Sequence, residues 1–153
     1  MTKEQVIEIL KGLLMEYMDQ TREPVKVLLH KHISEFERGC TGAHSKIQKS
    51  TWGLGLHTLE VVRKSLELNQ EFDEIDLIET CLIHDLRTWK EFPLKDHQVT
   101  AIRATKGLSW EIWRHQEMFR FTALILVADM WSAYVNVDTK IQAVIDRLKH
   151  GQD

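Results

Sequence analysis

The stretch Ile78-Glu79-Thr80-Cys81-Leu82-Ile83-His84-Asp85-Leu86 is largely apolar and ends with a histidine next to an aspartate. Asp73 precedes this stretch as a plausible N-cap, so the spacing predicts a helix from Asp73 to about Leu86. His84 and Asp85 each follow apolar or small residues by one helical turn, which places them on faces that otherwise bury hydrophobic side chains. We therefore expect an ionisable pair in the interior of this helix.

The rest of the chain also favours helices. Its 153 residues include only two prolines and seven glycines, which leaves long segments free to be helical. No segment alternates with the period of a strand for long enough to indicate a sheet. Residues 39–53 have no helical period and are rich in Gly, Ser, Thr and Lys, as is typical of a functional loop. We expect one all-α domain over 1–153, a compact bundle of five or more helices. The spacing of apolar side chains predicts the other helices at residues 3–19, 24–38, 54–69, 96–106, 109–135 and 138–149.

Composition and charge exclude several classes of protein. Hydrophobic residues make up 43% and charged residues 28%, and the net charge is −3, so neither a nucleic-acid duplex nor an anionic membrane is an expected partner. The longest apolar run, residues 123–128, is too short to span a bilayer, and the N-terminus lacks the apolar run of a signal peptide. The two cysteines, Cys40 and Cys81, form no disulfide framework. A cytoplasmic protein with reduced thiols is the expectation.

Two further ionisable residues are expected to face inward. His57 shares a helical stripe with Leu54 and Val61, and Asp129 lies in the nearly apolar segment 124–131. A buried carboxylate costs several kcal/mol unless it is paired or binds a cation, and one divalent ion relieves all four groups together. A single buried histidine is more often a hydrogen-bonded core residue. The combination, however, favours a metal site, and its imidazole and carboxylate ligands suit Mn, Fe, Co, Ni or Zn better than Ca. The predicted ligands are His57, His84, Asp85 and Asp129.

These residues occur in recognisable local contexts. The chain reads Trp52-Gly53-Leu54-Gly55-Leu56-His57-Thr58-Leu59-Glu60-Val61, then Leu82-Ile83-His84-Asp85-Leu86, then Leu126-Val127-Ala128-Asp129-Met130. Over about residues 40–135 this order resembles the HD superfamily of metal-dependent phosphohydrolases, an all-α family. The resemblance implies hydrolysis of a phosphate ester or anhydride, most readily of a nucleotide, with Asp85 orienting or deprotonating a metal-activated water. Residues 1–38 lie outside it and are expected to form a helical cap or a subunit contact of a homo-oligomer.

The number of metal ions stays open. Some relatives bind a second ion through extra histidines, and the candidates here are His97 and His115. His97 begins a segment, His97-Gln98-Val99-Thr100-Ala101-Ile102, that resembles the family's His-x-x-x-Gly-Ala. His115 precedes Asp129 by fourteen residues, about 21 Å along an unbroken helix, and is the weaker candidate. A two-iron oxygenase, the first alternative function, would need both histidines. The second alternative is a non-catalytic metal- or nucleotide-binding module.

Contacts to the small phosphorylated substrate are expected from the loop before His57 and from the segments after the His-Asp pair. Where many relatives continue that pair with Gly-Lys, this chain has Arg87-Thr88-Trp89-Lys90. Trp52 or Trp89 could stack on a base. The candidate substrate contacts are His44, Lys46, Lys49, Arg87, Lys90 and Arg103.

Overall fold

The regular structure of this protein is helical. A computed structural model describes residues 2–41, 44, 48–107 and 116–135. Over these residues the prediction of an all-α fold with five or more helices and no sheet is confirmed. The α-helices are α1 (Lys3–Met18), α2 (Glu23–Lys31), α3 (Gly53–Leu68), α4 (Glu74–Ile83), α5 (Asp96–Thr105) and α6 (Gln116–Met130). They are joined by two 3₁₀ helices, Ile33–Glu37 and Trp89–Glu91, and α6 is followed by a π-helical segment, Trp131–Val135.

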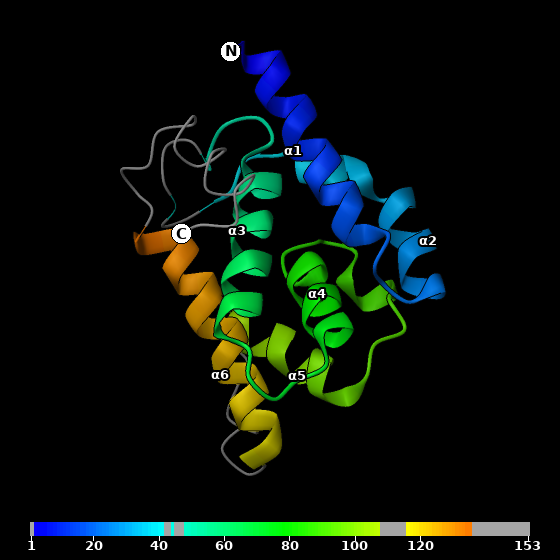
Figure 1. The fold of residues 1–153 in the computed structure, drawn as a ribbon, viewed down its shortest axis with the longest axis vertical. Helices are drawn as coiled ribbons and strands as arrows, with labels where there is room; N and C mark the ends of the chain where they lie inside the picture. Colours follow the sequence, from blue (N-terminus) through cyan, green and yellow to red (C-terminus); the bar gives the residue numbers. More distant parts are fainter. Residues whose placement is uncertain (1, 42–43, 45–47, 108–115, 136–153) are drawn as a thin grey trace.

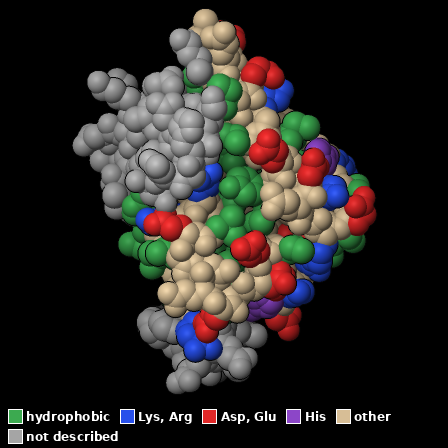
Figure 2. All heavy atoms as spheres, viewed as in Figure 1, with side chains coloured by type: hydrophobic (Ala, Val, Ile, Leu, Met, Phe, Trp, Pro, Cys, Tyr) green, Lys and Arg blue, Asp and Glu red, His purple; other side chains and the backbone are tan. Residues whose placement is uncertain are grey.

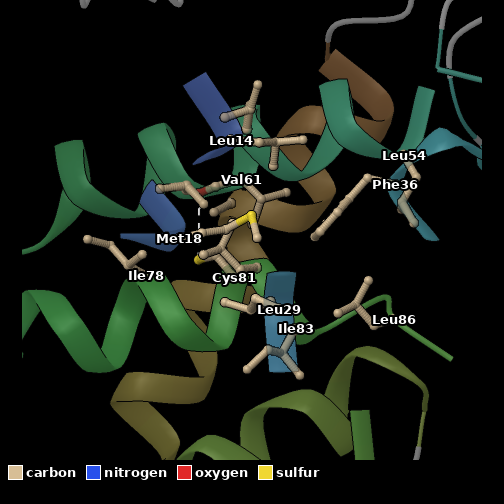
Figure 3. Packing of buried hydrophobic residues seen from close by; sticks show 14 of the residues in the cluster. Leu14, Met18, Leu29, Phe36, Leu54, Val61, Ile78, Cys81, Ile83 and Leu86 are labelled. Carbon is tan, nitrogen blue, oxygen red and sulfur yellow. Dashed lines mark hydrogen bonds between the residues drawn. The ribbon is translucent and has the colours of Figure 1, made fainter. Parts of the chain in front are cut away.

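The helices pack around α3 and α4. In Figure 1, α3 runs beside α6, α4 lies next to α3, and α1 and α2 cover the other side of the bundle. Helix α5 packs on both α4 and α6. Side chains from α1 to α6 form one hydrophobic cluster, and Figure 3 shows Leu14 and Met18 of α1 meeting Val61 of α3 and Cys81 of α4 inside it. Residues 2–38 therefore contribute to the same core as the helices that carry the candidate ligands.

The predicted N-cap of α4 is confirmed, but this helix ends earlier than expected. The Asp73 carboxylate accepts hydrogen bonds from the backbone N–H groups of Ile75 and Asp76, at 2.8 and 3.1 Å. Helix α4 stops at Ile83 rather than Leu86, and His84 is its C-cap. Pro24 stands in the first turn of α2, as expected.

Two other predicted helices differ from the structure. The one predicted over 24–38 is divided into α2 and the 3₁₀ helix Ile33–Glu37, and the described part of the one predicted over 109–135 ends in the π-helical segment. The predicted helix start at residue 109 and the predicted helix 138–149 lie outside the described residues.

The two cysteines are free thiols in the interior. The Sγ of Cys81 lies 3.2 Å from the hydroxyl of Ser65, and burial raises the pKa of this thiol to about 11. Burial raises the pKa of Cys40 to about 12. Both cysteines thus behave as small buried residues and not as reactive thiols.

On the face of the molecule drawn in Figure 2, acidic and basic side chains are interspersed, and neither kind forms a large patch of one charge. Within the described residues, no helix combines the length and the apolar character that crossing a membrane requires.

Candidate metal centre

Four side chains from three helices converge on one point inside the bundle. His57 lies on α3, Asp129 lies near the end of α6, and His84 and Asp85 stand where α4 ends. One ligand atom of each residue can be chosen so that all four atoms lie within 4.8 Å of one another. The side chains of both histidines are completely buried, whereas those of Asp85 and Asp129 are 32% and 21% exposed. The expected convergence of these residues is observed, and the cluster could hold a metal ion.

The spacing of the ligand atoms fits a transition-metal ion. The Nε2 atom of His57 lies 2.9 Å from Oδ1 of Asp129 and 3.3 Å from Oδ2 of Asp85. The Nε2 atom of His84 lies 3.1 and 3.2 Å from the same two oxygens. With metal–ligand bonds of about 2.1 Å, neighbouring ligands are separated by roughly 3.0 Å in an octahedral site and roughly 3.4 Å in a tetrahedral one. An ion could therefore enter with small movements of these side chains.

The tautomer of His84 is determined by a backbone group. Its Nδ1 lies 2.6 Å from the carbonyl oxygen of Cys81, one turn earlier on α4. Because a carbonyl oxygen can only accept, Nδ1 carries a proton and donates it, which leaves the lone pair of a neutral ring on Nε2. This is the usual second contact of a histidine that binds metal through Nε2.

The tautomer of His57 is determined by the hydroxyl of Ser132. This hydroxyl accepts a hydrogen bond from Nε2 of Gln48 at 3.0 Å and lies 3.2 Å from a carboxylate oxygen of Glu60, to which it donates. Its remaining acceptor position faces Nδ1 of His57 at 2.9 Å, so Nδ1 is the donor and Nε2 again keeps the lone pair. Ser132, Glu60 and Gln48 are all buried, and sequence reasoning missed them.

Local backbone packing places Gln48 beside this hydroxyl. A Cβ atom at residue 53 would lie 1.7 Å from the carbonyl oxygen of Gln48, so only glycine permits this approach of the loop to the first turn of α3. The preceding residue, Trp52, has a φ of 66° and forms the N-cap of α3. The Trp-Gly pair before His57 thus has a structural role in positioning the contacts of His57.

The four groups polarise one another strongly. Burial raises the pKa of the Asp85 carboxyl, but the charge of His84 and hydrogen bonds from both histidines outweigh burial and hold this pKa far below its usual range. The same balance lowers the pKa of Asp129. Burial lowers the pKa of His84, yet the two carboxylates outweigh it and the net shift is well upward. A divalent ion would displace the protons from the two Nε2 atoms, since histidine ligates metal only in its neutral form.

A pocket of about 430 Å³, pocket A, lies beside Asp85. The guanidinium of Arg38 donates a hydrogen bond to the carbonyl oxygen of Asp85, and Nζ of Lys106 donates one to the carbonyl oxygen of His84 at 3.0 Å. These cations satisfy carbonyl oxygens that have no helical partner where α4 ends. Sequence reasoning missed both residues because each is distant in the chain. The polar and aromatic residues that line pocket A are Arg38, Thr41, His44, Asp85, Arg87, Trp89 and Lys106.

Two of the expected substrate contacts line pocket A. The ring of His44 lies edge-on to that of His57, with 4.8 Å between centroids, and its Nδ1 lies 2.6 Å from the carbonyl oxygen of Thr41. Burial, followed by the charge of His57, lowers the pKa of His44, which keeps this imidazole neutral. Arg87 is exposed and also lines pocket A.

The other expected contacts lie elsewhere. Lys90 and Arg103 are exposed and line a second pocket of about 490 Å³, pocket B, which shares Trp89 with pocket A. Lys49 is exposed and lines neither pocket. Trp52, the other stacking candidate, is buried in the core, and Lys46 lies outside the described residues.

The structure does not bring His97 into the metal cluster. Its Nε2 lies 3.0 Å from a carboxylate oxygen of Asp76, and its ring packs edge-on against Phe121 with 4.7 Å between centroids. Asp76 is in the first turn of α4, eight residues before His84 and therefore about 12 Å away along the helix axis. His97 thus contacts the opposite end of α4. His115 lies outside the described residues.

Comparison of the chain with protein-family models, with curated proteins and with solved structures finds no match. The assignment of a function therefore depends on the residues of the site itself.

Proposed function

We propose that this protein is a metal-dependent phosphohydrolase that acts on a small phosphorylated molecule, most readily a nucleotide. The observation that carries the proposal is that Asp85 belongs both to the four-ligand cluster and to the wall of pocket A. Its Oδ2 lies 3.3 Å from Nε2 of His57 and 3.2 Å from Nε2 of His84, and the residue also lines a pocket whose wall includes Arg38, Arg87 and Lys106. A site that joins a cation-binding cluster to a phosphate-binding pocket suits hydrolysis of a phosphate ester or anhydride.

The ligand atoms for the ion are Nε2 of His57, Nε2 of His84, and one carboxylate oxygen each of Asp85 and Asp129. A divalent ion held there would supply an acidified water and polarise a phosphoryl oxygen. Oδ2 of Asp85 lies 3.3 Å from Nε2 of His57 and 3.2 Å from Nε2 of His84, and the same residue lines pocket A. A carboxylate at this position would orient the water or accept its proton.

The cationic wall of pocket A suits a phosphate dianion. Arg38 and Lys106 are held in place by the carbonyl groups of Asp85 and His84, so they need little ordering when substrate binds. The backbone N–H of Arg87 donates to the carboxylate of Glu35 at 2.6 Å, and its exposed side chain lines the same pocket. Guanidinium groups pair with phosphate through two parallel hydrogen bonds, which gives this wall its selectivity for phosphate.

The alternative functions receive less support. A two-iron oxygenase would need His97 as a ligand, and His97 pairs with Asp76 at the far end of α4. A non-catalytic binding module would keep the cluster and pocket A without turnover, so only a kinetic measurement separates it from the enzyme.

The test is a phosphate-release screen over nucleoside mono-, di-, tri- and cyclic phosphates with Mn, Co, Ni and Mg. Asp85→Asn should lower turnover at least about 100-fold, because it replaces a charged ligand and potential base with a neutral amide. Asp19→Asn is the matched control, since Asp19 is an exposed aspartate that pairs with His30 outside the site. Nucleotide binding without phosphate release with any of these metals would identify a binding module instead.

A further inference from the structure

Pocket B lies directly next to the proposed phosphate site. Pockets A and B are about 430 and 490 Å³, and the side chain of Trp89 lines both. A pocket of either size falls within the range that binds small molecules in proteins. Trp89 follows Asp85 by four residues and begins the 3₁₀ helix after α4. Trp89 is therefore the residue that the walls of the two pockets have in common.

The segment that carries Trp89 is held in place before any ligand binds. Glu35 accepts a hydrogen bond from the backbone N–H of Arg87 and another from the hydroxyl of Thr88, so one carboxylate fixes the two residues before Trp89. Nζ of Lys90 lies 5.6 Å from the centroid of the Trp89 ring. A wall that is already ordered binds a flat ligand at lower entropic cost than a mobile one.

The walls of pocket B combine apolar surface with positive charge. Phe92, Leu94 and Val99 supply the apolar part, and Lys90 and Arg103 are exposed beside it. Within the part of the chain that the structure describes, no carboxylate forms an ion pair with Lys90 or Arg103. An aromatic ring system with polar edges matches this combination. The ring can pack on the apolar side chains, its face can stack on a guanidinium, and its polar edge can accept a hydrogen bond from one.

We propose that pocket B is the specificity subsite, which binds the aromatic base of a nucleotide whose phosphate lies beside Asp85 in pocket A. The placement of the phosphate rests on the proposed function, whereas the binding of an aromatic ring in pocket B does not. Val99 on α5 and Arg103 one turn later are the residues whose side chains discriminate between substrates. Small phosphate esters reach only pocket A, and nucleotides occupy both pockets.

The kinetic test compares kcat/KM for the four common nucleoside 5′-monophosphates with kcat/KM for methyl phosphate, which is too small to reach pocket B from Asp85. Val99→Glu places a carboxylate in the apolar wall and should lower the ratio of the best nucleotide to methyl phosphate about tenfold or more. Val127→Glu, at a 53% exposed valine on α6, is the matched control and should keep the wild-type ratio. An unchanged ratio in Val99→Glu overturns the proposal.

A binding measurement separates this inference from the proposed function. Isothermal titration of the same nucleotides and of the four unphosphorylated nucleosides needs no turnover, and Arg103→Gln should weaken nucleotide binding several-fold. Arg103 is exposed, so this variant tests the subsite even where Val99→Glu lowers stability. Nucleotide binding that Arg103→Gln weakens, without turnover, supports pocket B as the subsite and argues against hydrolysis of these monophosphates. Turnover of methyl phosphate, with neither nucleotide nor nucleoside bound at millimolar concentration, refutes the subsite alone.

Discussion

Ser132→Ala removes one hydroxyl group next to the metal site, and the structure allows its effect on stability and on metal affinity to be estimated. It donates to Glu60 and accepts from Gln48 and His57, at 2.9 to 3.2 Å, and the Ser132 side chain is completely buried. Ser132→Ala deprives three buried polar groups of this partner. Leaving a buried polar group unsatisfied costs about 1–3 kcal/mol, and a water in the vacated space can recover part of the loss. We expect the free energy of unfolding to fall by about 2 kcal/mol.

The effect on metal binding should be larger than the effect of a general loss of stability. Without Ser132 the donor at Nδ1 of His57 has no fixed acceptor, so the ring loses its orientation and its preferred tautomer. Loss of such a contact typically weakens metal affinity about 10- to 100-fold. The assay is a competition titration of Mn, Co and Zn against a chelator of known affinity, with urea unfolding of the metal-free protein alongside.

Ser65→Ala is the matched control. Ser65 is equally buried on α3, but its hydroxyl contacts Cys81 and no metal ligand. It should lower stability by about 1 kcal/mol and leave metal affinity unchanged. Equal metal affinities in Ser132→Ala and the wild type would refute the role assigned to the hydroxyl, and equal losses in both variants would show that general loosening of the core is the cause.

Three further predictions concern the same cluster and its support. His97→Ala should leave the metal content per chain unchanged by elemental analysis, and a loss of one bound ion would restore His97 as a ligand. In the metal-free protein the pKa values of His57 and His84 are raised, so the stabilisation they provide is complete below pH 6.5 and is lost as pH rises through their folded-state values. The melting temperature of the chelated protein should therefore fall as pH rises above about 6.5, while metal binding strengthens over the same range; a flat profile would contradict this. Arg22→Met leaves the fully buried carboxylate of Glu79 without its cation and should cost about 3 kcal/mol in urea unfolding, a loss that Lys11→Met, at an exposed pair, should not show.

The amino-acid sequence by itself determined the all-helical fold class and the four candidate ligands. Apolar side chains at three- and four-residue spacing identify the buried face of each helix, and His57, His84 and Asp129 stand out because ionisable residues are rare on such faces. The N-cap at Asp73 follows from an equally local rule and is confirmed. All of these features depend on residues within a few positions of one another, which is the range that a sequence pattern covers.

Only the tertiary structure decided what surrounds these ligands. Arg38 reaches the carbonyl of Asp85 across 47 positions, and Ser132 reaches His57 across 75, so no local spacing signals either contact. His97 shows the same limit, because its sequence context resembles a ligand segment while the packing of α5 on α4 directs its ring to Asp76. The sequence pattern around a histidine on a helix is the same whether its side chain contacts a carboxylate or binds a metal ion. The packing of one helix on another determines which of the two it meets.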